Sequence, residues 1–558
     1  MSGNSPNNKK SIVDEYVRRL SKYASDIKFI DDTLFAAIPS NSFREAVKLV
    51  HDEFDCYLRT CAGVDERPVN GFFAMYYIFG DDRNGLNIVL KTYADPSKQV
   101  FPSVTDICPA ADWCEMEARD LLGLEFKGRQ QYRLVLPNWW PKNLYPLRKD
   151  VPHDIKPKPS FTGERVSVGR KGSSAPIPVG PYHPALHEPE YFELYVEGEK
   201  VVDVKYRGFH VHRGIEKLAE TRMTYQQIPF LAERICGICG FVHSTCYCQA
   251  VEKAARIDVP ERALFIRSII LEIERIHSHL LWVGVAAHLL GYDTGFMHSW
   301  RIREHVMYLA ELLTGSRKTY GINLIGGVRK DINEDKIPKT LEVLSIIEKE
   351  FARLVDTMIS VPEIKFRLKE TGILPKEDAR KLSVVGPTAR GSGLDRDNRR
   401  DLPYAAYKYA DFNVPVYDEG DNLARTLVRV DEVFESIKII RQLIEQLPKG
   451  PIMAEEIDIP ENRMAVSLVE APRGEDVHFV ITGYGKPYRW RVRAPTYQNI
   501  PALKVMLNGV MLADAPLTIA SIDPCFSCTD RIVVVKSDGR REVLHLPSQW
   551  GGMGCSRL

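Results

Sequence analysis

The sequence lacks a hydrophobic run long enough to cross a membrane. Its longest apolar stretch, residues 280–292 (LLWVGVAAHLLGY), falls short of the ~20 residues that a bilayer-spanning helix needs. The N-terminal residues, MSGNSPNNKKSIVDEY, also lack the apolar segment of a secretory signal. We therefore expect a cytoplasmic protein, which leaves docking onto a membrane partner open.

An excess of charge of one sign is also missing. The chain has 75 Lys and Arg against 74 Asp and Glu, a formal net charge of +1, whereas nucleic-acid-binding proteins are usually strongly basic. There is no internal repeat and no phosphate-binding G-x-x-x-x-G-K-S/T motif. Residues 391–396 (GSGLDR) lack the third glycine and the preceding strand of a dinucleotide-binding fingerprint. We therefore expect no nucleic-acid partner and none of these nucleotide-binding folds.

The eleven cysteines do not predict a disulfide framework, because the cytosol keeps thiols reduced. Six have no partner at ligand-like spacing and are interpreted as small buried apolar residues: Cys56, Cys61, Cys108, Cys114, Cys246 and Cys248. Cys555 is assigned no role. The remaining four form two C-x-x-C pairs.

A chain of 558 residues is too long for one ordinary domain. Residues 1–10 are polar and predict a disordered tail. Residues 11–152 mix helix-like and strand-like segments, with strands expected at 73–80 and 84–94 and an amphipathic helix at 112–124, as in a small α+β domain. Residues 153–178, rich in Pro, Gly, Ser and Lys, predict a linker.

The section from 179 to 531 has a different pattern. A hairpin is expected at 190–208, and apolar residues then recur every three to four positions in long helices: 261–290, 300–313, 338–358 and 422–445. Short strands and turns return from about residue 463. The predicted fold class is α+β, a small N-terminal domain followed by a mainly helical domain with β-rich edges.

The two C-x-x-C pairs are Cys236 with Cys239 and Cys525 with Cys528. Two such pairs can form a four-sulfur metal site. Spacing alone leaves open a zinc or iron–sulfur site, an unusual transition-metal site, or a dithiol redox pair. The pairs lie at opposite ends of a large domain, and both are accompanied by polar groups that a closed structural site does not need: Glu188, Glu216, His243 and Arg473. A shared site requires folding to bring the four sulfurs within a few ångströms.

Both motifs, RICGICGFVHS (234–244) and DPCFSCTDR (523–531), resemble the two metal-binding signatures of nickel–iron hydrogenase large subunits. HRGIEKLAETR (212–222) and EAPRGE (470–475) fit the same family, and PYHPALHEPEYFEL (181–194) resembles its membrane-bound, complex I-related members. The N-terminal segments EMEARDLLGLEFKG and WWPKNLYPLRKD resemble the complex I hydrophilic-arm subunit next to the quinone-site subunit. That fusion resembles the large subunit of formate hydrogenlyase. The resemblance implies that residues 11–152 serve as a docking domain for hydrophilic-arm partners.

The resemblance implies a Ni–Fe(CO)(CN)₂ centre that interconverts H₂ with protons and electrons. It implies that Cys236 and Cys525 are terminal nickel ligands, while Cys239 and Cys528 bridge nickel and iron. Cys525 and Arg473 are candidate bases, although a guanidinium stays protonated and acts more naturally as a fixed cation. Pro472, Pro495 and Thr496 match positions that surround the cyanides.

Four of the candidate residues have competing interpretations. The resemblance implies that Glu188 relays protons away from the terminal cysteine, whereas the alternative is an exposed turn residue. Glu216 matches a ligand of an outer magnesium or iron site, and the alternative is an ion pair on a helix surface. His243 follows Cys239 by one helical turn and can donate to its sulfur, or can be a structural histidine. For Arg473 the alternative is a surface salt bridge.

The family also implies processing and partners. A maturation protease is expected to cut after Arg531 and remove residues 532–558, although these residues could instead form a strand over the cavity of an unprocessed precursor. This chain has no further cluster motif, so an iron–sulfur small subunit must carry electrons. Ferredoxin-like and membrane subunits and a formate dehydrogenase are expected as well. This places the chain on the cytoplasmic face of the inner membrane.

Two other hypotheses stay open at this point. A fused pair of complex I-type quinone-reducing subunits explains the domain order but needs no cysteines. A non-catalytic scaffold with a four-cysteine zinc site explains the cysteines but predicts no redox activity.

Overall fold

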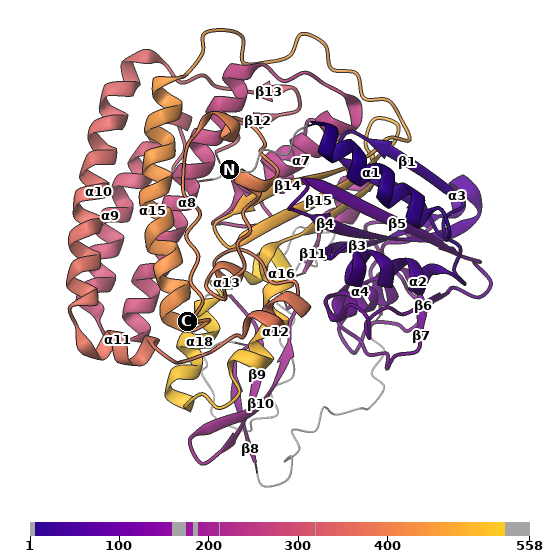
Figure 1. Cartoon of the computed structure of the whole chain (residues 1–558), viewed down its shortest axis with the longest axis horizontal. Helices are drawn as coiled ribbons and strands as arrows, with labels where there is room; N and C mark the ends of the chain where they lie inside the picture. The colour runs from indigo at the N-terminus through magenta and orange to yellow at the C-terminus, as the bar shows by residue number, and fades with distance from the viewer. Residues whose placement is uncertain (1–5, 159–173, 182–187, 211, 319, 530–558) are drawn as a thin grey trace.

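The computed structural model describes residues 6–158, 174–181, 188–210, 212–318 and 320–529. The expected cleavage site at Arg531, the tail 532–558 and Cys555 lie outside the described residues. The fold is α+β, as predicted. Figure 1 shows a bundle of long helices on one side, a smaller sheet domain on the other, and the strands β14 and β15 between them.

The N-terminal domain is built on a five-stranded sheet of order β1-β2-β5-β4-β3. The predicted pair of strands is confirmed as antiparallel β4 and β5, and the predicted helix as α4. The helices and strands are α1 (Pro6–Leu20), β1 (Asp26–Ile30), β2 (Thr33–Ala37), α2 (Phe43–Lys48), β3 (Tyr57–Glu66), α3 (Arg67–Asn70), β4 (Phe72–Asp81), β5 (Leu86–Ala94), β6 (Val100–Pro102), α4 (Asp112–Leu122) and β7 (Glu125–Lys127).

Two predictions at the edges of this domain need correction. Residues 6–10 belong to α1 rather than to a disordered tail, because the apolar face of that helix packs Val13, Tyr16 and Leu20 into the domain core. The last residues of the expected linker form β8 (Ala175–Val179), which pairs with β9 (Tyr191–Glu197).

The large domain begins with the sheet β10-β9-β8. The hairpin expected at 190–208 is confirmed as β9 and β10 (Lys200–Arg207). Then follow β11 (Arg213–Gly214), α5 (Ile215–Arg222), α6 (Ile228–Ala232), α7 (Gly240–Ala255), α8 (Glu261–Leu289), α9 (Asp293–Thr314), β12 (Asn323–Leu324), β13 (Gly327–Val328), α10 (Ile337–Ile359), α11 (Pro362–Leu368), α12 (Lys376–Lys381), α13 (Pro387–Arg390), α14 (Asn398–Asp401) and α15 (Asn422–Glu445). The helices α8, α9, α10 and α15 form the bundle in Figure 1.

The C-terminal part of the large domain starts with the three-stranded sheet β14 (Met464–Ala471), β15 (Gly474–Thr482) and β16 (Pro487–Arg493). Beyond it the expected strands and turns are wrong, because the chain forms short helices: α16 (Pro495–Asn499), α17 (Leu503–Met506), α18 (Ala515–Ser521) and α19 (Phe526–Thr529).

The two domains share an apolar core. Ala62, Val64 and Tyr76 of the N-terminal sheet pack with Leu468 and Phe479 of the β14–β15 hairpin. Because burying apolar area is the main driving force of folding, this shared core fixes the hairpin against the N-terminal domain. The hairpin also carries Arg473, so the packing bears on the site described next.

Candidate metal centre

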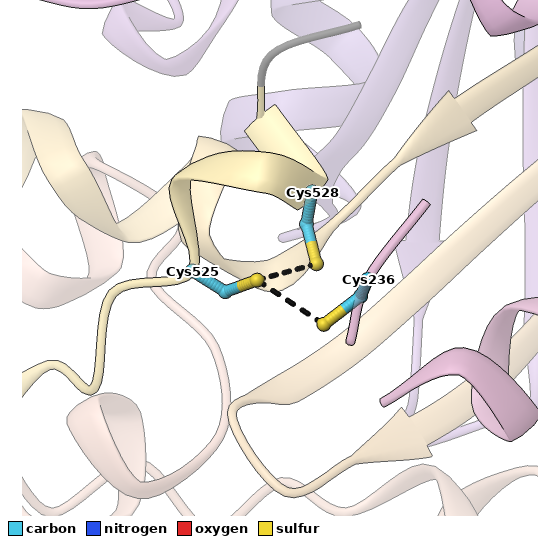
Figure 2. A group of neighbouring side chains, drawn as sticks. All are labelled: Cys236, Cys525 and Cys528. Atoms are coloured by element: carbon cyan, nitrogen blue, oxygen red, sulfur yellow. Dashed lines mark hydrogen bonds between the residues drawn. The ribbon is translucent and has the colours of Figure 1, made fainter. Parts of the chain in front are cut away.

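The four cysteines of the two C-x-x-C pairs meet at one place in the large domain. Their sulfurs form a closed ring, with 3.2 Å between Cys236 and Cys525, 3.2 Å between Cys236 and Cys239, 3.7 Å between Cys239 and Cys528, and 2.9 Å between Cys525 and Cys528. Figure 2 shows three of them pointing toward one another, Cys525 and Cys528 from one segment and Cys236 from another. All four are at most 2% exposed. The convergence expected from the sequence is therefore confirmed.

The first pair lies at the N-terminus of α7. Cys239 is the residue before this helix, and the N–H groups of Ile238 and Cys239 donate to the Cys236 sulfur at 3.2 Å. Glu274 of α8 accepts from the N–H groups of Phe241 and Val242 at 3.1 and 3.0 Å, which satisfies donors that a helix start leaves free. The helix start also favours negative charge at the sulfurs.

The second pair is held by side chains from distant segments. The Cys525 N–H donates to the Thr496 hydroxyl at 3.0 Å. Glu188 accepts from the N–H of Ser527 at 2.7 Å and from its hydroxyl. Glu188 is therefore half-buried and attached to the second cysteine loop, rather than being an exposed turn residue.

Arg213 links the two cysteine loops. Its guanidinium donates to the carbonyls of Ile235 at 2.5 Å and Ser527 at 2.7 Å. One group thus joins the backbone before Cys236 to the backbone before Cys528. No role was predicted for Arg213, although it lies within the hydrogenase-like segment 212–222.

Arg473 is 2% exposed, which rules out a surface salt bridge. Its guanidinium donates to the Asp523 carboxylate at 2.8 Å, to the Asp523 carbonyl at 2.7 Å and to the Ser278 hydroxyl at 2.9 Å. Burial by itself lowers the pKa of Arg473, but the nearby Asp523 and cysteine sulfurs outweigh burial and raise the pKa. Arg473 is therefore a permanent cation. Asp523 and Ser278 were missed, since their pairing with Arg473 joins three distant segments.

His243 is fully buried beside the first pair. One of its ring nitrogens lies within 4.8 Å of the sulfurs of Cys239 and Cys528, and Nδ1 lies 2.9 Å from the Asp476 carboxylate. Burial lowers the pKa of His243, but the nearby Asp476 and Cys239 raise it by more than burial lowers it. The pKa of His243 therefore lies above its ordinary value. The structural interpretation is thus supported by Asp476, whereas Nε2 has no hydrogen-bond partner among the described residues and donation to the Cys239 sulfur stays a prediction.

The remaining predicted residues are Pro472, Pro495 and Glu216. Pro472 precedes Arg473 in the turn between β14 and β15, and Pro495 is the first residue of α16 next to Thr496. Glu216 is 4% exposed and pairs with Arg489 at 2.8 Å. Within the described ranges, no group of three or more His, Cys, Asp or Glu ligands includes Glu216. The ion-pair alternative is thus present, in a buried form.

The six isolated cysteines are all buried, as predicted: Cys56, Cys61, Cys108, Cys114, Cys246 and Cys248. Each is at most 3% exposed. No helix in the described part of the chain is both long and apolar enough to span a bilayer.

Three family models match the chain. The respiratory-chain NADH dehydrogenase 30 Kd subunit matches residues 36–156, the 49 Kd subunit matches 290–465 and 453–531, and the nickel-dependent hydrogenase family matches 213–289. Formate hydrogenlyase subunit 5 of Escherichia coli (strain K12) is 44% identical over 512 residues, covering 90% of both chains. The chain belongs to the complex I-related family of nickel–iron hydrogenase large subunits.

Other relatives agree with this family. Hydrogenase-4 component G of Escherichia coli (strain K12) is 44% identical over 501 residues, which cover 89% of this chain and 87% of that protein. A solved chain from the membrane-bound sulfane sulfur reductase, an archaeal respiratory membrane complex, is 32% identical with a TM-score of 0.61, covering 64% of this chain and 99% of that one. This hydrogenase large subunit is an oxidoreductase subunit acting on H₂, and the family implies a nickel–iron centre.

Proposed function

We propose that the four cysteines hold a Ni–Fe(CO)(CN)₂ group, with Cys236 and Cys525 as terminal nickel ligands and Cys239 and Cys528 as bridging ligands. The carrying observation is the closed ring of four buried sulfurs from two remote segments, with neighbours 2.9–3.7 Å apart. Thiolates that share a metal at ~2.3 Å are separated by comparable distances. Four soft thiolates suit nickel better than oxygen-preferring metals.

When bound, this group supplies the reversible interconversion of H₂ with protons and electrons. The protein holds a permanent cation beside the sulfurs, since Arg473 is fixed by three hydrogen bonds to Asp523 and Ser278. A preorganised charge in a water-poor site stabilises charge that develops during reaction. We assign Arg473 this electrostatic role, while Cys525 receives the proton.

Glu188 is proposed to move the proton onward. Its carboxylate is attached to Ser527, two residues after Cys525, and is half-buried. A carboxylate can accept and release a proton when it lies within hydrogen-bond reach of the donor or of a bridging water. Pro472, Pro495 and Thr496 are proposed to surround the cyanide ligands, and His243 is proposed to donate to the Cys239 sulfur.

Membership of the family supports further proposals about an outer metal site and about partners. Glu216 is proposed to contribute to an outer magnesium or iron site, in addition to its pairing with Arg489. Electrons are delivered by an iron–sulfur small subunit, with ferredoxin-like and membrane subunits and a formate dehydrogenase completing the assembly at the cytoplasmic face of the inner membrane. A maturation protease is proposed to cut after Arg531.

Elemental and infrared analysis of the purified native complex tests the proposal. Equal nickel and iron in this chain, with infrared bands of bound CO and CN⁻, is the expected result. Zinc alone supports the scaffold hypothesis, and a metal-free chain supports the quinone-reducing hypothesis. The mass of the mature chain, which should end at Arg531, checks processing separately.

A further inference from the structure

The turn that carries Arg473 is flanked by two buried carboxylates. In the β14–β15 register Glu470 pairs with Glu475 and Ala471 with Gly474, so that Pro472 and Arg473 alone form the turn. Like charges directly opposite one another on a hairpin destabilise it. The carboxylates are 2% exposed, so water does little to screen them. The position of Arg473 therefore depends on the groups that neutralise this pair.

The counter-charges come from several elements. Arg390 of α13 donates to Glu470 at 2.9 Å. The Asn398 side-chain amide reaches both carboxylates, at 3.3 Å from Glu470 and 3.2 Å from Glu475. Glu475 also pairs with Arg493 of β16 and with Arg59. Arg59 is the cation that does not belong to the large domain.

Arg59 lies on β3 of the N-terminal domain and is 0% exposed. Its guanidinium donates to Glu475 and, at 2.5 Å, to Asp82. Its carbonyl accepts from Arg493 at 2.6 Å. On the neighbouring strand, a Cβ at Gly80 would lie 2.4 Å from the Arg59 guanidinium, so glycine there leaves room for this side chain.

The two buried carboxylates of the hairpin, Glu470 and Glu475, depend on nearby donors and cations. Burial, followed by the repulsion of Asp397, raises the pKa of Glu470 to about 7 despite its contact with Arg390. Besides its contacts with Arg59, Asn398 and Arg493, Glu475 accepts a hydrogen bond from the Tyr57 hydroxyl at 2.9 Å. Tyr57, like Arg59, comes from β3.

We propose that Arg59 is a positioning residue of the hydrogenase site: it neutralises Glu475 and so holds the Pro472–Arg473 turn beside the four sulfurs. The N-terminal domain thus contributes to the reaction rather than serving for docking alone. The inference rests on the proposed role of the cysteine centre and of Arg473.

The test compares Arg59→Met with Lys149→Met in the purified complex. Lys149 is a matched control because it also crosses from the N-terminal domain, pairing with Glu220 at 2.7 Å, but it does not contact the hairpin carboxylates. We expect Arg59→Met to keep its nickel, to shift the infrared cyanide bands and to lose roughly 10²-fold in turnover, as for a catalytic group misplaced by about 1 Å. Lys149→Met should match the wild type.

A second variant separates charge compensation from general instability. Glu475→Gln in the Arg59→Met background removes one negative charge and so offsets the positive charge lost with Arg59. The bands should therefore return toward their wild-type positions, and nickel should be retained. Wild-type bands and turnover in Arg59→Met overturn the inference. So does a double variant that behaves as badly as Arg59→Met, or that fails to accumulate. A wild-type chain without CO and CN⁻ bands overturns instead the proposed function.

Discussion

The two cysteine pairs form one ring of sulfurs, but they are anchored in different ways. Cys236 and Cys239 lie at the start of α7, a helix of 16 residues whose first N–H groups are satisfied by Glu274. Cys525 directly precedes the four-residue helix α19 near the end of the described chain, and Cys528 lies within that helix. Their loop depends on side-chain contacts from Glu188 and Thr496. One half of the ring is thus part of the helical scaffold, and the other half is attached to it.

The two cysteine pairs also differ in the pKa values of their thiols. Burial raises the pKa of Cys236, but hydrogen bonds from the neighbouring thiols and the charge of Arg473 lower it well below the ordinary value. Contacts with Cys236 and Cys239 raise the pKa of Cys525, and burial followed by the same contacts raises the pKa of Cys528. Thiolates are the form that binds metals, so these directions favour thiolates at the first pair. The first pair is built into the helical scaffold, and the second pair completes the ring from a loop held by side chains.

The largest expected effect is on the second pair. Cys528→Ser should abolish hydrogen turnover, because the proposed bridging thiolate is lost. It should also block removal of residues 532–558, because we expect the proposed maturation protease to act only after metal insertion. The mass of the purified chain reports processing, and a hydrogen assay reports turnover. Cys248→Ala, at a buried cysteine outside the ring, is the control and should be processed normally. Accumulation of processed Cys528→Ser contradicts the proposed coupling.

Replacing the Glu188 carboxylate should lower hydrogen turnover and leave the nickel content unchanged. Glu188→Gln can still accept a hydrogen bond from Ser527 but cannot carry a proton, so turnover should fall roughly 10²–10⁴-fold, the range of a lost general acid or base. Nickel content and infrared bands should remain. Glu199→Gln, at an exposed turn position, is the control. Wild-type turnover in Glu188→Gln removes this residue from the proton route.

A buried carboxylate close to the first cysteine pair should make the stability of the fold depend on pH. Burial raises the pKa of Glu233, three residues before Cys236, to about 7. An acid with a raised folded-state pKa stabilises the fold fully below its unfolded value of about 4.5, and this contribution is lost as pH rises toward 7, on the order of 3 kcal/mol in total. Glu233→Gln should therefore flatten the fall in thermal unfolding midpoint between pH 5 and pH 8. An unchanged slope contradicts the burial argument.

The smallest effect is expected at Thr496. Thr496→Val keeps the shape of the side chain but leaves the buried Cys525 N–H without its acceptor, which should lower the free energy of unfolding by about 1–2 kcal/mol. Thermal or denaturant unfolding measures this change. Thr426→Val removes only a hydroxyl contact within α15 and serves as the matched control. An equal loss in both variants shows that the second loop does not depend on Thr496.

Local patterns predicted the regular elements well. The helix at 422–445 and the strands at 73–80 and 84–94 show the periodicity of their burial, and the structure places them within a few residues. The helical start of residues 6–10 and the short helices after 495 were missed, because their packing partners lie far away in the chain.

The site residues divide in the same way, into those that local motifs predict and those that depend on distant contacts. The four cysteines, Arg473 and His243 were found because motifs report them. Asp523, Ser278 and Arg213 were missed as partners, since each contact joins segments that only the folded chain brings together. Arg59 had no signal at all, because its role follows from the β14–β15 register and from the contact between two domains.

The most direct test of nickel binding by the ring of four sulfurs is nickel K-edge X-ray absorption on the purified native complex. We expect a nickel coordination shell dominated by four sulfur atoms at distances of ~2.3 Å, as for other metal thiolates, and a shell reduced by one sulfur in any Cys528→Ser chain that retains nickel. A nickel ion surrounded mainly by nitrogen or oxygen, with sulfur absent, contradicts the assignment of Cys236, Cys239, Cys525 and Cys528 as its ligands.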